Sequence, residues 1–138
     1  MATNFKNIRA AIKAKIDTLE TVGVTYNYER STFAKFPAVI IAASENESDY
    51  GSTQNDRLVF VFKLRAYYPI KQESDHQAAE GFLEGVVDEI LTSFKERNAL
   101  GTACDWLEPA PSAWYYEERS EGVYRVAEIR LRCVKYVG

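Results

Sequence analysis

Arg57-Leu58-Val59-Phe60-Val61-Phe62-Lys63-Leu64-Arg65-Ala66-Tyr67-Tyr68 is a long alternating segment. The rest of the chain is expected to pack on it or on the helix that follows. Side chains of a β-strand alternate between two faces, so the even positions from Leu58 to Ala66 share one face. The odd positions carry Lys63 and Arg65. The pattern predicts a long strand with one core face and one polar face.

After Pro69, the residues from Ser74 to about Arg97 predict a helix that covers the core face of this strand. Ser74 or Asp75 can cap its N-terminus. Its apolar residues recur at helical spacing and make one broad stripe: Ala79, Phe82, Leu83, Val86, Val87, Ile90 and Phe94. Arg57–Phe94 is therefore expected to form the central strand and helix of the domain.

Two glycines in this helix, Gly81 and Gly85, lie opposite the apolar stripe by helical spacing. Each costs about 1 kcal/mol relative to alanine in a helix interior. They predict a smooth groove that a neighbouring subunit can approach closely, because no Cβ blocks it. The alternative is that both are tolerated substitutions with no partner.

A first helix is predicted from Asn4, with Phe5, Ile8, Ile12, Ile16 and Leu19 on one side and Gly23 at its end. Its basic residues are expected on a solvated face: Lys6, Arg9, Lys13 and Lys15.

Four further strands are predicted from alternation and apolar runs. Two precede the long strand, at Val24–Arg30 and Ala38–Ala43. The other two follow the helix and form an antiparallel hairpin that turns at Glu121-Gly122 and ends near Tyr136. In the first strand of the hairpin, Pro109 and Pro111 predict a bent or edge strand. The result is one α+β domain, residues 1–138, with a mostly antiparallel sheet packed against two helices in the order α-β-β-β-α-β-β.

Residues Ser44 to Asp56 are polar and acidic and predict a long loop that is either functional or mobile. In the functional reading, the loop contacts a neighbouring subunit or partner. Its candidate contact residues are Glu45, Glu47, Asp49 and Tyr50.

The composition limits the class of protein. The chain has 138 residues, 46% of them hydrophobic, and a net charge of -3. Nucleic-acid binders are usually clearly basic, so any DNA contact is expected to be local. No apolar run approaches the ~20 residues of a membrane span, and the chain reads as made in the cytoplasm. The two cysteines, Cys104 and Cys133, are expected to be free and buried.

Chemistry-bearing residues are sparse. His76 is the only histidine and is expected on the surface of the first helical turn. Glu80, Glu84 and Asp88 form a row of like charges that is expected to face solvent; acid/base work or Mg²⁺ binding is the alternative. No phosphate-binding loop or nucleophile motif is present. No catalytic residue, metal or cofactor is therefore predicted.

A basic patch is predicted on the polar face of the sheet, provided that the long strand and the last strand are neighbours in register. Its members are Lys63, Arg65, Arg130 and Arg132, with Tyr67, Tyr124 and Tyr136 at its margin. Such a mixture is typical of nucleic-acid or protein contact surfaces. The alternative is that Glu117, Glu118 and Glu128 neutralise it as cross-strand pairs.

The element order, together with FKLRAYYP (62–69), EGFLEGVVDEIL (80–91) and VYRVAEIRLRC (123–133), resembles the tail terminator proteins of long-tailed bacteriophages, also called tail completion or neck proteins. The likeness covers nearly the whole chain. It implies a virion protein without enzyme activity, whose ring, typically a hexamer, caps the tail tube, stops its growth and meets the head connector. DNA would pass through the lumen of the ring.

Two other functions remain open from the sequence. A head–tail connector or tail-tube subunit would share the size and the sheet-rich build. A small cytosolic α+β enzyme or ligand-binding domain would use the row formed by Glu80, Glu84 and Asp88.

Overall fold

The structure is a computed structural model, which describes residues 4–30, 32–49, 56–95, 99–101 and 103–137. It confirms the predicted α+β class and the predicted order of elements. In chain order these are α1 (Asn4–Ile16), β1 (Val24–Tyr26), β2 (Ala38–Asp49), β3 (Asp56–Ile70), α2 (Ser74–Phe94), β4 (Trp106–Arg119) and β5 (Gly122–Val137).

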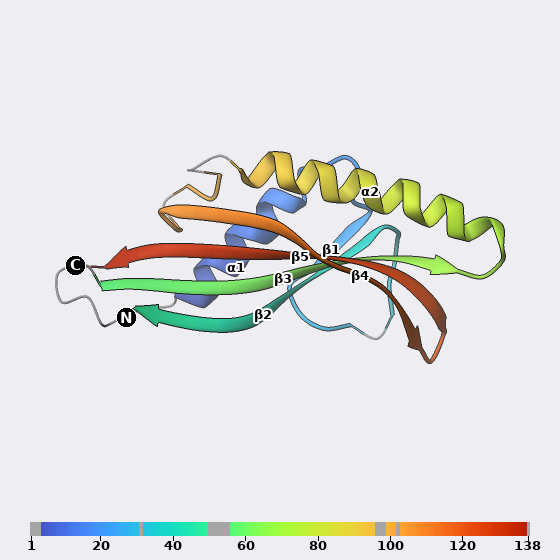
Figure 1. Cartoon of the computed structure of the whole chain (residues 1–138), viewed down its shortest axis with the longest axis horizontal. Helices are drawn as coiled ribbons and strands as arrows, with labels where there is room; N and C mark the ends of the chain where they lie inside the picture. The colour runs from blue at the N-terminus through green and yellow to red at the C-terminus, as the bar shows by residue number, and fades with distance from the viewer. Residues whose placement is uncertain (1–3, 31, 50–55, 96–98, 102, 138) are drawn as a thin grey trace.

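The strands form a five-stranded sheet in the order β1-β2-β3-β5-β4. β1 is parallel to β2, and the remaining pairs are antiparallel. The long central strand β3 pairs with β5 from Asp56↔Val137 to Ile70↔Val123, so the sheet is strongly elongated (Figure 1). The sheet has two edges. One edge is formed by the short β1 and by the part of β2 beyond it, and the other edge is formed by β4.

Both helices cover one face of the sheet, here called the helix face. Ile8, Ile12 and Ile16 of α1 and the apolar stripe of α2 form one buried cluster with the even positions of β3. Burial of these side chains is the main stabilising contribution to the fold. Figure 1 shows α2 lying lengthwise along the sheet. Phe82 is an exception to the prediction, because it is 53% exposed and stacks on Tyr68 at the margin of the core.

The opposite face, here called the outer face, is less polar than predicted. The cover segment (residues 27–30 and 32–37) places Phe33 and Phe36 in a cluster with buried Tyr67 and Tyr124. Figure 1 shows this β1–β2 connection on the side of the sheet away from α2. Tyr67 and Tyr124 are therefore core residues of a second, aromatic cluster, and not the margin of an exposed patch as predicted.

The predicted loop at 44–56 is wrong in its first half, since β2 continues to Asp49. Its backbone pairs with β3 from Ala38↔Tyr67 to Asp49↔Arg57, with a register shift between Ala43 and Glu45. The polar sequence reflects a strand at the side of a sheet, where polar residues are tolerated, and not a loop. Tyr50 lies outside the described residues.

Gly23 does not end the first helix, which stops at Ile16. A Cβ on Gly23 would lie 2.7 Å from the Phe36 carbonyl oxygen, so the close approach of two backbones requires glycine there. β1 is also shorter than predicted, because the chain leaves the sheet after Tyr26 to begin the cover segment. In the second half of the chain, β4 is an edge strand with a register shift between Pro111 and Ala113, as its prolines predict.

Candidate functional site

The clearest open feature of the fold is one side of β2. β1 pairs with β2 only from Ala38 to Ile40. Beyond Ile40, no other described strand pairs with that side of β2, which continues to Asp49. Backbone N–H and C=O groups on an open strand side are available to another chain. Ile41–Asp49 is therefore called the open edge.

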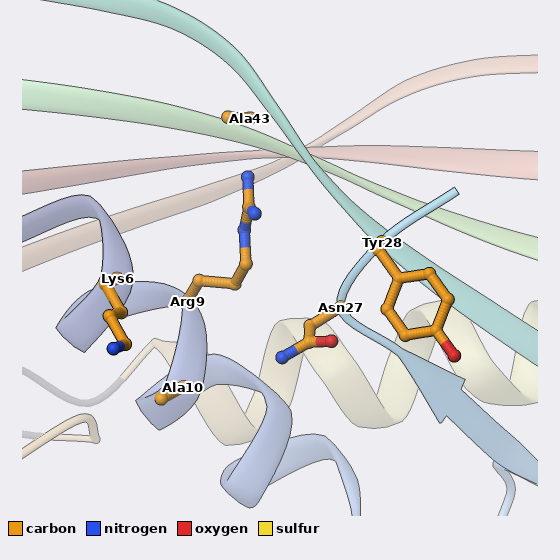
Figure 2. Close-up of a pocket in the computed structure, with 6 residues that line it drawn as sticks. All are labelled: Lys6, Arg9, Ala10, Asn27, Tyr28 and Ala43. Atoms are coloured by element: carbon orange, nitrogen blue, oxygen red, sulfur yellow. The ribbon is translucent and has the colours of Figure 1, made fainter. Parts of the chain in front are cut away.

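A groove of about 600 Å³ lies beside the open edge. It is called the edge groove, and its lining comes from α1, the start of the cover segment and β2: Lys6, Arg9, Ala10, Asn27, Tyr28 and Ala43. Figure 2 shows α1 on one side and Asn27 and Tyr28 on the other, with Ala43 between them on the sheet. The groove occupies the position that β1 would fill if it continued along β2.

Arg9 carries the charge inside this groove. Its side chain extends from α1 toward the sheet near Ala43 (Figure 2). Its Nε is buried and has no hydrogen-bond partner among the described residues. A guanidinium group that is partly removed from water favours a carboxylate or another anion as its partner. Exposed Lys6 adds a second positive charge to the same groove.

The solvated face predicted for α1 is therefore wrong for Arg9. The residue lies four positions after Phe5 and three before Ile12, so it borders the apolar stripe of α1. This spacing in the sequence could have indicated that Arg9 is half-buried. Asn27 and Tyr28 gave no such signal, because their place depends on where β1 ends.

The second groove runs beside α2 and has a volume of about 370 Å³. It contains both predicted glycines, together with Phe82 and the 20–23 connection. A Cβ on Gly81 would meet nothing within 4 Å, whereas one on Gly85 would lie 3.7 Å from Thr21 Cγ2. The chain itself thus approaches Gly85, and Gly81 faces open space.

Replacing Gly81 by alanine is expected to raise the free energy of unfolding by about 0.5–1 kcal/mol, because alanine lowers the entropy cost of the helix and meets no neighbour. Urea unfolding monitored by far-UV circular dichroism measures this change. The Gly122→Ala variant is the control, since Gly122 has a φ of 139° that disfavours alanine. A destabilised Gly81→Ala protein would contradict the open geometry.

Glu89 fastens the 20–23 connection to α2. Its carboxylate accepts hydrogen bonds from the Thr21 hydroxyl at 2.5 Å and the Thr21 backbone N–H at 3.0 Å. The hydroxyl bond is the main reason why the pKa of Glu89 is lowered. This connection forms one wall of the α2 groove.

The lowered pKa of Glu89 predicts a pH-dependent contribution to stability. The contribution is present above the ordinary pKa of 4.5 and is lost as the pH falls through the lower pKa of the folded state. We expect Glu89→Gln to lower the melting temperature at pH 7 and to approach the wild type at pH 3. Exposed Glu84→Gln is the control. A difference between Glu89→Gln and wild type that stays constant with pH would contradict this account.

The predicted basic row is brought together on the outer face. Lys63 pairs with Arg130 across the ladder, Val61 with Arg132, and Arg65 with Glu128. Acidic side chains largely neutralise this row. The alternative prediction is confirmed for Glu128, whose Oε2 lies 3.9 Å from Lys63 Nζ. Arg132 bonds to Glu108 at 2.6 Å, and Arg65 pairs with Glu29.

Glu117 does not join this row, because it pairs with Arg119. The outer face is therefore a surface of alternating charges over this region. Such a surface favours specific protein contacts over nonspecific attraction of nucleic acid.

The residues considered for catalysis are dispersed. His76 lies 3.2 Å from the Tyr116 hydroxyl, and Glu80 makes two bonds to Arg125 at 3.2 and 3.0 Å. Glu84 and Asp88 are exposed. Among the described residues, no group of three or more His, Cys, Asp or Glu side chains is placed to hold a metal ion.

Cys104 and Cys133 are free and buried, which confirms the prediction. Their side chains are hydrogen-bonded to each other, which lowers the pKa of Cys104 and raises the pKa of Cys133. Burial adds to the increase at Cys133. The pair packs in the core between β5 and the start of β4.

In the part of the chain that the structure describes, no helix is long and apolar enough to cross a membrane. A scan of the chain against models of known protein families found no match, and a search of curated proteins found none either.

Proposed function

We propose that this protein is a structural subunit of a bacteriophage tail that assembles into a ring, caps the tail tube and joins it to the head connector. The proposed ring, with six subunits as the expected number, ends polymerisation of the tube by protein contacts alone. DNA passes through its lumen without sequence-specific contacts. The proposed location is the neck of the virion, after synthesis in the bacterial cytoplasm.

The observation that supports assembly most strongly is the pair of unlike sheet edges. One is the open edge of β2, and the other is β4 at the far end of the strand order. Contact between two different surfaces of one chain is head-to-tail, and it closes into a ring when the rotation permits. A subunit with two unlike edges has the surfaces that such a ring needs.

The charge-balanced outer face is compatible with a position around DNA or beside another protein. Lys63, Arg65 and Arg132 are paired with Glu128, Glu29 and Glu108, so these three do not form an unscreened cationic surface. A lumen of this kind lets DNA pass without tight binding, because strong phosphate contacts depend on uncompensated Lys and Arg.

Electron microscopy of the purified protein, alone and mixed with tail tubes, tests the proposal. We expect rings of uniform size, seated at tube ends. Light scattering after size-exclusion chromatography gives the mass of the same sample. A protein that stays monomeric at high concentration and leaves tube ends bare would exclude the proposed ring.

The acidic part of β2 is the proposed contact with the tube. Substitution tests this contact better than deletion, because Glu47–Asp49 are paired with β3 and their removal would disturb the sheet. The better variant neutralises Glu45, Glu47 and Asp49 as Gln, Gln and Asn, with Glu20, Glu73 and Glu84 changed to Gln as the control of equal charge. We expect loss of tube capping in the first variant alone.

The α2 groove offers a second test of the ring. Gly81→Gln and Gly85→Gln place side chains in the groove, and we expect them to reduce the oligomer mass if a neighbouring subunit lies there. An unchanged mass would remove this groove from the interface and leave the sheet edges.

A further inference from the structure

We propose that the edge groove binds the second half of β4, Ala113–Arg119, from another copy of this chain. This inference rests on the proposed function as a ring subunit and names the surfaces that meet. The neighbour's β4 would occupy the vacant strand position beside β2, and its acidic end would face Lys6 and Arg9.

Only part of β4 is suited to pair with another strand. Pro109 and Pro111 have no backbone N–H, and the register shifts between Pro111 and Ala113. Prolines and irregularities are the usual protection of a sheet edge. The segment after the shift, Ala113–Arg119, has no proline and no further strand on its outer side among the described residues.

This segment is held rigid by its own subunit. Arg125 lies between two aromatic rings, 5.5 Å from the centre of Trp114 and 4.5 Å from that of Tyr116. Glu80 fixes the Arg125 guanidinium with two hydrogen bonds, and His76 contacts the Tyr116 hydroxyl. Trp114 and Tyr116 are nevertheless 37% and 51% exposed. Rigid, exposed aromatic side chains bury area on binding with little loss of entropy.

Strand direction and sheet face agree with this pairing. β2 is antiparallel to β3, β3 to β5, and β5 to β4, so β4 runs antiparallel to β2. Adding a neighbour's β4 to β2, with the helix faces on the same side, gives an ordinary antiparallel ladder. Trp114 and Glu118 pair with Ala127 and Val123 of β5, which places them on the helix face. Arg9 also approaches the sheet from that face.

The charges of the edge groove and of Glu118 on the incoming strand are complementary. The groove is lined by the positively charged side chains of Lys6 and Arg9. The β4 segment brings exposed Glu118. A carboxylate beside the Arg9 guanidinium would pair with its positive charge in a site partly removed from water. Because the groove and the donor strand are different surfaces, the contact is head-to-tail and can repeat around a ring.

A charge exchange tests the inference. Arg9→Glu and Glu118→Arg each place like charges together, and we expect each to raise the dissociation constant of the oligomer about tenfold or more. The double variant restores opposite charges and is expected to return within about threefold of wild type. Lys15→Glu and Glu84→Arg are the matched controls on α1 and α2. Light scattering over a concentration series gives the constants, and circular dichroism verifies folding.

Ala43→Lys tests the strand pairing separately, since a lysine on the open edge blocks an incoming strand and Ala43 lies in the groove. Exposed Ala14→Lys on α1 is its control. Wild-type rings that persist in Arg9→Glu, Glu118→Arg and Ala43→Lys would overturn this contact and leave the proposed function standing. A wild type that is monomeric alone and on tail tubes would overturn both.

Discussion

Replacing Phe62 by alanine is expected to lower the free energy of unfolding by about 3–5 kcal/mol, the largest effect of any single change considered for this chain. Phe62 lies in the middle of β3, is fully buried, and belongs to the cluster that both helices cover. Removing its ring costs the transfer free energy of the side chain and leaves a cavity between sheet and helices. Urea unfolding at pH 7 measures the loss.

Phe82→Ala is the matched control, because Phe82 is the same residue type but is 53% exposed on α2. Its stacking on Tyr68, with ring centres 5.1 Å apart, is expected to contribute about 1 kcal/mol. Equal losses in the free energy of unfolding for the two variants would contradict the assignment of Phe62 to the core and of Phe82 to the α2 groove.

Arg119→Gln is expected to lower the free energy of unfolding by about 2–4 kcal/mol and to loosen the cover segment. The Arg119 guanidinium donates to the Arg30 carbonyl oxygen, the Tyr67 hydroxyl and Glu117. It also lies over the rings of Phe33 and Tyr67, at 5.1 and 4.9 Å from their centres. One side chain thus joins the β4–β5 hairpin to the cover segment.

Hydrogen exchange distinguishes this clamp from a general loss of stability. In Arg119→Gln, the amides of residues 32–36 are expected to exchange faster, while those of α2 remain protected. Arg119→Lys keeps the charge but loses the planar group, so it should fall between wild type and Arg119→Gln. Unchanged exchange in the cover segment would show that Phe33 and Phe36 hold it without Arg119.

The central strand, α2 and the C-terminal hairpin could be predicted from the sequence because their patterns reflect local geometry. Alternation from Leu58 to Ala66 and helical spacing from Ala79 to Phe94 both follow from which side faces the core. The polar composition of Ser44–Asp49 led to the wrong prediction of a loop, whereas these residues continue β2 at the edge of the sheet. Tyr67 was misplaced because nothing local indicates that the cover segment crosses the outer face.

The candidate site could be predicted only in part. Strand neighbours and register brought Lys63 and Arg130 together, as expected. The edge groove was not predicted, since it requires two facts that the sequence does not give: that β1 ends at Tyr26, and that Arg9 lies beside the part of β2 left open. Sites formed where an element stops depend on tertiary structure and leave little periodic signal.

Electron microscopy of the wild-type protein with tail tubes shows whether the protein forms rings at tube ends. Light scattering on the same preparation gives the oligomer mass. We expect uniform rings, with six subunits as the expected number, bound at the ends of tubes that no longer grow. Monomeric protein, tubes with bare ends and continued tube growth would contradict it.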